Sequence, residues 1–145
     1  MIDIRPLQSA DRTAWEVLAR GYKAFYETTL ADEDYERTWQ HLLRADRIHG
    51  LGAHLDGRLV GMAHYYFHPS IWVDEVCYLQ DLFVDPAVRG RGVARSLIEA
   101  VAATARARGA DRLYWHTQQH NATARALYDK VAQHKGFIVY TRSFA

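Results

Sequence analysis

The sequence predicts a mixed α/β fold in a single domain over residues 1–145, and three observations lead to that class. Strand-like patterns open and close the chain, helical patterns lie between them, and a strand, a glycine-bearing loop and a helix follow one another over residues 78–108. A chain of 145 residues has room for one core that buries about two thirds of the unfolded surface.

The composition is that of a packed globular protein, with 49% hydrophobic and 24% charged residues. The net charge of +1 argues against a general nucleic-acid-binding surface. A single cysteine forms no internal disulfide, and the sequence has no secretory leader pattern and no apolar run of membrane-spanning length. We therefore expect a cytoplasmic protein that contacts neither membrane nor nucleic acid.

The first elements follow from local patterns. Residues 2–7 alternate apolar and polar side chains and predict a strand, in which Pro6 lacks a ladder donor. Ser9 and Asp11 are candidate caps for a helix that carries Trp15 and further apolar side chains on one face.

A second helix and a hairpin come next. The acidic run at residues 32–34 favours a helix start, because negative charge stabilises the N-terminal end of the helix dipole. Residues 50–55 and 59–67 predict two strands joined at Asp56-Gly57, a strong signal for a two-residue turn.

The rest of the chain is organised around residues 78–108. Residues 78–84 form a β-branched and aromatic run that Asp85-Pro86 ends, and apolar residues recur at helical spacing from 97 to 105. Between them lies the loop Arg89–Ala94, which faces the positive end of the helix dipole and its free backbone N–H groups. This arrangement predicts a phosphate site, in which the glycines remove side chains and the arginines add donors.

Spacing separates the families that bind phosphate in such a loop. A Walker loop ends in Gly-Lys-Ser/Thr, which is absent here. A Rossmann fingerprint needs a third glycine where Arg95 stands, and its acidic ribose partner should close the next strand, whereas Asp111 precedes that strand.

The loop Arg89–Ala94 matches Arg/Gln-x-x-Gly-x-Gly/Ala, and so resembles the pyrophosphate loop of the GCN5-related N-acetyltransferases. Further matches are residues 113–117 as a fifth strand, 121–128 as an Asn-started, Tyr-bearing helix, and Gly136-Phe137 as the final strand. Within the family, the runs around Asp81 and Trp115 resemble the yeast-type histone and polyamine acetyltransferases. The resemblance covers roughly residues 52–144.

The resemblance implies a twisted mixed sheet, mostly antiparallel, whose splayed central strands hold the pantetheine arm of acetyl-coenzyme A. It also implies a homodimer paired through residues 137–140. The cofactor-binding residues expected from it are Leu82, Phe83, Val84, Arg89, Gly90, Arg91, Gly92, Val93, Ala94, Arg95, Asn121 and Tyr128.

Several of these residues also have an ordinary structural interpretation. Asn121 at a helix start is typical of an N-cap, and Tyr128 seven residues later shares its helix face and can be a core residue or a proton donor to the leaving thiolate. Cys77 lacks a recognisable His or Asp partner and is predicted to be structural. The histidine pairs at i,i+4 spacing fall on strands or turns, so no metal site is predicted.

The expected reaction is direct acetyl transfer to a primary amine of a small cationic acceptor, polyamine-like or amino acid-like. A lysine-bearing protein acceptor, or a coenzyme A-binding module without transfer activity, is the alternative. An alkylammonium with a pKa of about 10.4 must lose a proton before it attacks. Where polyamine relatives carry Glu-Asp this chain has Gln80-Asp81, so the base is left open between Asp81, Glu75 and a water relay.

The loop before that strand offers groups that suit a cationic acceptor. It is equally typical of an ordinary solvated loop. The acceptor-binding residues expected are Trp72, Asp74, Glu75, Gln80 and Asp81.

Overall fold

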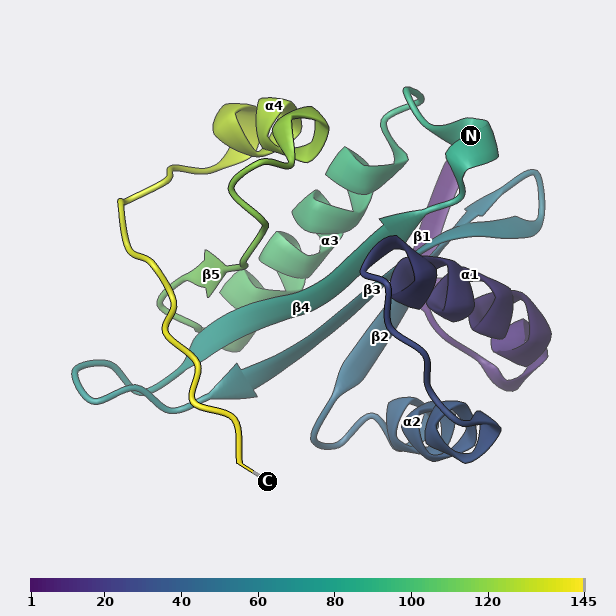
Figure 1. Cartoon of the computed structure of the whole chain (residues 1–145), viewed down its shortest axis with the longest axis horizontal. Coiled ribbons are helices and arrows are strands. Elements are labelled where there is room, and N and C mark those ends of the chain that lie inside the picture. The colour runs from purple at the N-terminus through teal and green to yellow at the C-terminus, as the bar shows by residue number, and fades with distance from the viewer. Residues whose placement is uncertain (145) are drawn as a thin grey trace.

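A computed structural model describes residues 1–144 of the chain (Figure 1). The strands are β1 (Ile2–Pro6), β2 (His49–Leu55), β3 (Arg58–His68), β4 (Val76–Val84) and β5 (Leu113–Tyr114). The helices are α1 (Arg12–Phe25), α2 (Asp32–Arg44), α3 (Val93–Arg108) and α4 (Ala122–Val131), with short 3-10 turns at Ser9–Asp11 and Pro86–Val88.

The strands form one mixed sheet in the order β1-β2-β3-β4-β5. Strands β1 to β4 pair with one another in antiparallel fashion, whereas β5 runs parallel to β4. The β4–β5 ladder has only two pairs, Cys77 with Leu113 and Tyr78 with Tyr114. Beyond Tyr78 the two strands separate, which confirms the splayed, mostly antiparallel sheet.

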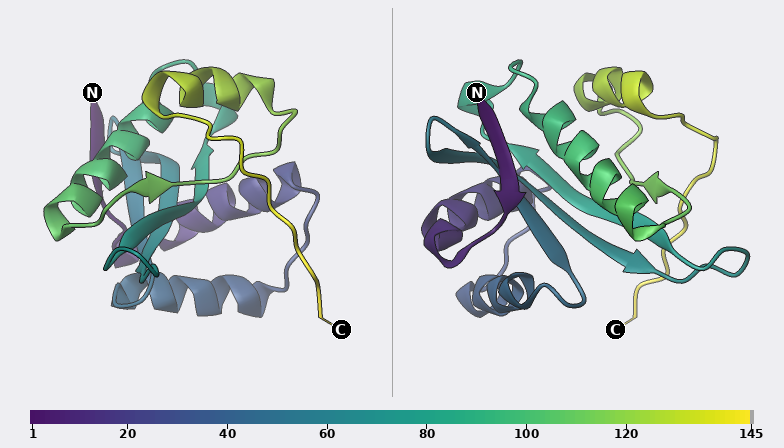
Figure 2. Two further views of the ribbon diagram at one scale, coloured as in Figure 1. Left: turned by 90° about the vertical axis from the view of Figure 1, so that its left-hand side faces the viewer. Right: turned by 180° about the vertical axis from the view of Figure 1, so that it is seen from behind.

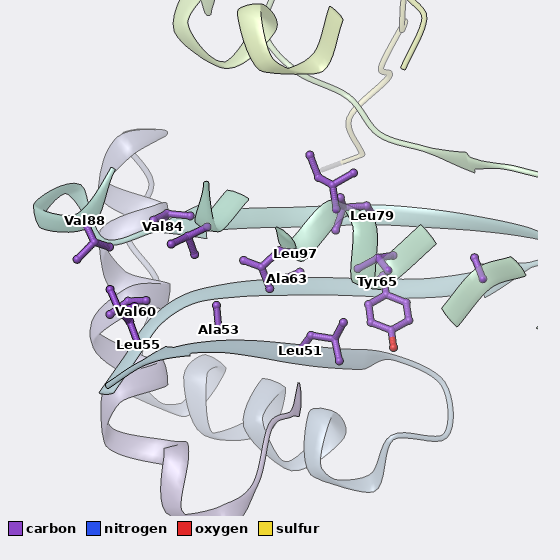
Figure 3. Packing of buried hydrophobic residues seen from close by; sticks show 14 of the residues in the cluster. Leu51, Ala53, Leu55, Val60, Ala63, Tyr65, Leu79, Val84, Val88 and Leu97 are labelled. Carbon is purple, nitrogen blue, oxygen red and sulfur yellow. The ribbon is translucent and has the colours of Figure 1, made fainter. Parts of the chain in front are cut away.

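Helices cover both faces of this sheet (Figure 2). Strands β2, β3 and β4 contribute Leu51, Ala63 and Leu79 to a buried cluster that also contains Leu97 of α3 (Figure 3). The opposite face packs against α1 and α2 through a second cluster. Its largest buried members are Trp15, Trp39, Tyr35 and Met62.

The predicted hairpin is confirmed, because β2 and β3 are joined at Asp56 and Gly57, which both have positive φ. Of the two predicted caps of the first helix, Asp11 stands at the N-cap position and Ser9 does not. Asp11 nevertheless makes no side-chain capping bond. Its carboxylate instead accepts from the Gln8 N–H at 2.8 Å and lies 3.0 Å from Nε2 of buried His54.

The final strand expected at Gly136-Phe137 is absent among the described residues, in which 132–144 have no regular secondary structure. The segment runs as an extended chain past β5 (Figure 1). Its large apolar side chains are exposed. A strand needs an edge to pair with, and the two-residue β5 supplies little of one. No helix of the described chain is long and apolar enough to cross a membrane.

Candidate active site

The loop between β4 and α3 has the geometry expected of an anion site. Gly90 and Gly92 have φ of 82° and 81°, a conformation that side-chain-bearing residues rarely adopt. Gly92 is the N-cap of α3, and no side chain caps that helix end. The first-turn N–H groups of Val93, Ala94 and Arg95 therefore point out of the helix end, where a ligand can accept from them.

The structure adds a second reason for glycine in this loop, and the room that the glycines leave for a ligand stays a prediction. A Cβ at Gly90 or Gly92 would meet no heavy atom within 4 Å, so the backbone angle, and not crowding by protein atoms, requires glycine. The close approach occurs at Gly61 on β3, where a Cβ would lie 3.0 Å from Cγ1 of Val93. Gly61 thus allows the first turn of α3 to sit directly on the sheet.

The arginines around the loop are exposed. The Arg89 guanidinium lies 5.7 Å from the Phe83 ring centroid, whereas Arg91 and Arg95 have no ion-pair partner among the described residues. These three cations surround an uncapped helix end, which suits a pyrophosphate.

The second half of β4 lines one side of the gap that opens between β4 and β5 beyond Tyr78, which we call the splay. Leu82 and Val84 pack on the α3 side, whereas the Phe83 ring packs on the α1 side against Tyr22, with ring centroids 6.2 Å apart. These side chains are the core residues that the sequence predicted. The backbone edge that faces β5 has no ladder partner beyond Tyr78, and an extended ligand arm fits there.

Helix α4 lies beside this splay (Figure 1). Asn121 caps it by accepting from the Ala124 N–H at 3.4 Å and donates to the Thr117 hydroxyl at 3.5 Å, so the N-cap interpretation is confirmed. Tyr128 is half-buried, and its ring packs edge-on against Trp115 at 5.4 Å. Burial, with a smaller contribution from Tyr26, raises the pKa of the Tyr128 phenol, which therefore keeps its proton at neutral pH.

Gln80 is an irregular point in β4. His64 pairs with Asp81 and Tyr65 pairs with Leu79, so Gln80 has no partner on β3 and forms a bulge. The Tyr22 hydroxyl donates to the Gln80 carbonyl at 3.5 Å. Burial, with the Asp81 charge second, raises the Tyr22 pKa, so this hydroxyl remains a donor.

Asp81 follows the bulge and faces α1. Its Oδ2 lies 2.9 Å from His64 Nδ1, and its side chain is only 16% exposed. Burial raises the pKa of Asp81, but the interaction with His64, with smaller contributions from Tyr22 and Lys23, outweighs burial and holds that pKa below its usual range. Asp81 is therefore a carboxylate at neutral pH.

The structure does not bring the other predicted acceptor residues to this point. Glu75 directly precedes β4 and accepts two hydrogen bonds from Arg108, at 2.7 and 3.1 Å, which lower its pKa. It precedes Asp81 by six residues, or about 20 Å of strand. Trp72, 92% exposed, and exposed Asp74 lie in the β3–β4 loop beyond that end.

Sequence reasoning missed Trp15, Tyr22 and His64 as site residues. The alternation of His64, Tyr66 and His68 on β3 was a usable signal, since it places three polar or aromatic side chains on one sheet face. Cys77 is free and fully buried, and burial raises its pKa to about 11. In the described part of the chain no group of three or more His, Cys, Asp and Glu is arranged to hold a metal ion.

Known proteins match both the sequence and this architecture. The profile of the Acetyltransferase (GNAT) family matches residues 14–132. The chain belongs to that family. It is 33% identical to the D-amino-acid N-acetyltransferase HPA3 of Saccharomyces cerevisiae over 98% of this chain and 91% of the yeast protein. It is also 37% identical to the thialysine N-epsilon-acetyltransferase of Caenorhabditis elegans over 58% of this chain and 52% of the relative.

Solved GNAT structures share the fold. The aminoglycoside acetyltransferase AAC(6')-Iy, in complex with a bisubstrate analogue containing CoA, superposes with a TM-score of 0.87 at 22% identity over 100% of this chain and 99% of that one. This GNAT protein is accordingly an N-acetyltransferase that uses acetyl-coenzyme A. The uncapped α3 terminus, the positive-φ glycines and the unpaired β4 edge all fit that cofactor.

Proposed function

We propose that this enzyme acetylates the primary amine of a small cationic acceptor, and that Asp81 binds the acceptor's ammonium group. The observation that carries the proposal is a largely buried, ionised carboxylate next to the β4 bulge, on the sheet face that α1 covers. The named relatives act on D-amino acids and on thialysine, which are small amine-bearing molecules. A lysine side chain of a protein remains the second candidate acceptor.

In this proposal each element has one task. Bound acetyl-coenzyme A supplies the thioester. The first-turn amides of α3 and the three arginines of the loop hold its pyrophosphate, and the open β4 edge pairs with its extended arm. Asn121 holds the start of α4, which presents Tyr128 to the splay, where the phenol donates a proton to the leaving sulfur.

The acceptor proton needs a separate route. Gln80 cannot take it, and the lowered pKa of Asp81 makes that carboxylate a poor base at neutral pH. Glu75 is held by Arg108 at the other end of β4. We therefore propose that Asp81 binds and orients the ammonium group, while its proton leaves through water at the exposed Gln80.

A panel of amines tests this function by release of free thiol from acetyl-coenzyme A. Diamines and amino acids should be turned over, and Asp81→Asn should raise the KM for these cationic acceptors about tenfold or more while leaving acetyl-coenzyme A binding unchanged. A weakly basic arylamine is neutral at the assay pH. If Asp81→Asn raised the KM for this amine as much as for the cationic acceptors, a charge role for Asp81 would be contradicted. Turnover of a lysine peptide alone would favour the protein acceptor, and no turnover at all a module without transfer activity.

We also propose that the enzyme is a homodimer, in which residues 136–144 of each copy cover the β5 side of the partner's sheet. Five large apolar side chains in this segment are between 64% and 89% exposed in the single chain. A group of exposed large apolar side chains of this kind supports a contact surface. The group consists of Phe137, Ile138, Val139, Tyr140 and Phe144.

A cytoplasmic location is part of the same proposal. It is supported by the free, buried thiol of Cys77, which requires no oxidising compartment. Subcellular fractionation of the tagged protein measures it directly.

A further inference from the structure

His64 and Asp81 are directly opposite each other on β3 and β4, on the sheet face that α1 covers. Their side chains, 12% and 16% exposed, meet with His64 Nδ1 2.9 Å from Asp81 Oδ2. On its other side the His64 ring meets Trp15, whose Nε1 lies 2.9 Å from His64 Nε2. One imidazole thus joins the buried α1 core to the carboxylate of the site.

The chemistry of the three groups fixes where the protons are. An indole Nε1–H can only donate, so His64 Nε2 accepts and carries no proton. The neutral imidazole then has its proton on Nδ1, which donates to Asp81 Oδ2. The direction of donation is therefore set from Trp15 through His64 to Asp81.

Trp15 holds its end of the chain firmly. It is 1% exposed, and its ring packs against Trp39 at 5.0 Å and Tyr35 at 6.5 Å. The indole cannot turn away without disrupting the α1–α2 core. His64 is consequently held in one orientation and one tautomer.

We propose that His64 is a positioning residue for acceptor recognition: the chain Trp15–His64–Asp81 orients the carboxylate so that its second oxygen, Oδ1, faces the acceptor ammonium beside the Tyr22 hydroxyl. This inference rests on the proposed function of Asp81. It also excludes His64 as the general base, because its only basic nitrogen already accepts from Trp15. The arrangement therefore differs from a catalytic relay, in which the outer imidazole nitrogen faces the substrate.

Two substitutions separate the halves of the chain. In His64→Asn the side-chain amide nitrogen takes the place of Nδ1 and can still donate to Asp81. In His64→Gln the longer amide reaches the place of Nε2 and can accept from Trp15, but the donor to Asp81 is lost. Both variants replace the ring with an amide of similar polarity, so each controls for the other.

We expect His64→Gln to raise the KM for a cationic amine by about tenfold to a hundredfold, the range for one lost hydrogen bond to a charged group. Its kcat should change less, and its acetyl-coenzyme A binding should be unchanged. His64→Asn should stay within about threefold of the unmodified enzyme. Equal effects of both variants, or equal effects on cationic and neutral acceptors, would overturn the positioning role.

A second measurement does not depend on turnover. Nitrogen NMR of histidine-labelled enzyme, with the His64 signals assigned by their loss in His64→Asn, reports the tautomer. We expect a protonated Nδ1 and an unprotonated Nε2 at neutral pH. The opposite tautomer or an imidazolium would overturn the proposal even if the enzyme is active, whereas the expected tautomer in an enzyme that acetylates no amine would reject only the proposed function.

Discussion

At the scale of single residues, Tyr128 is the group that we propose protonates the leaving thiolate. It packs against Trp115 and the core cluster on the α3 side, and it retains its proton because burial raises its pKa. A phenol in this state can donate but cannot act as a base near neutral pH. In the proposed function Tyr128 and Asp81 therefore have opposite tasks, one as proton donor and one as a fixed negative charge.

Tyr128→Phe removes only the hydroxyl, so packing against Trp115 should survive. We expect kcat to fall by roughly 10- to 1000-fold, with little change in acetyl-coenzyme A binding, because proton donation to the sulfur is needed only as the bond breaks. Steady-state kinetics and calorimetric titration measure the two effects. Tyr65→Phe, which removes another buried hydroxyl outside the site, is the control and should leave kcat unchanged.

A Tyr128→Phe enzyme with near-full turnover would show instead that water protonates the thiolate. Tyr128 would then be only a wall of the pocket.

Single residues were predictable from sequence where a local motif carries them. Gly92, Asn121 and Asp81 each stand at a fixed offset from a strand or helix end, and the structure places each at such an end or bulge. His64 has no such motif. Its role depends on the β3–β4 register, and the bulge at Gln80 shifts that register by one residue, so only the folded hairpin reveals its partner.

At the scale of elements, α3 carries the largest part of the proposed cofactor site. Its N-terminus has a left-handed glycine and no side-chain cap, and its C-terminus ends at Gly109, which is also left-handed with φ of 90°. Both ends of α3 thus need a residue that tolerates positive φ, but only the N-terminal end, at Gly92, faces the splay. This symmetry provides a matched pair of substitutions.

Gly92→Val and Gly109→Val should each destabilise the fold by about 1–2 kcal/mol, because a side chain disfavours left-handed backbone. Only Gly92→Val should also weaken coenzyme A binding, by at least about tenfold, or roughly 1.4 kcal/mol. Denaturant unfolding and calorimetric titration with coenzyme A measure the two quantities. If Gly92→Val bound coenzyme A as tightly as the unmodified enzyme, or if both variants lost the same affinity, the loop would not be part of the cofactor site.

The elements themselves were largely predictable, because α1, α2, α3 and the β2–β3 hairpin each bury a periodic apolar face or turn at a clear signal. The predicted fifth strand, residues 113–117, shortened to Leu113–Tyr114. Strand propensity at Trp115 and beyond does not produce a ladder there, since β4 has already diverged. Propensity describes a residue, whereas a strand also needs a neighbour.

At the scale of the whole molecule, the same reasoning explains the missing final strand. Residues 137–140 are apolar and β-prone, yet a single chain leaves them extended and exposed. The pattern predicts pairing, and in our proposal the partner of this segment is a second copy of the chain. Burying these side chains is worth about 1.5–3 kcal/mol for each fully covered one.

The last prediction is that the enzyme sediments at twice its chain mass of 16.7 kDa. Ile138→Lys combined with Phe137→Asp should convert it to a monomer, because both charges would have to be buried in the proposed interface. Ile71→Lys combined with Trp72→Asp is the matched control, since these side chains are 87% and 92% exposed in the β3–β4 loop. Sedimentation equilibrium should find that control variant dimeric. An unmodified enzyme that stays monomeric at high micromolar concentration would contradict the proposed dimer. A dimer that survives the substitutions at 137 and 138 would show that the two copies meet at another surface.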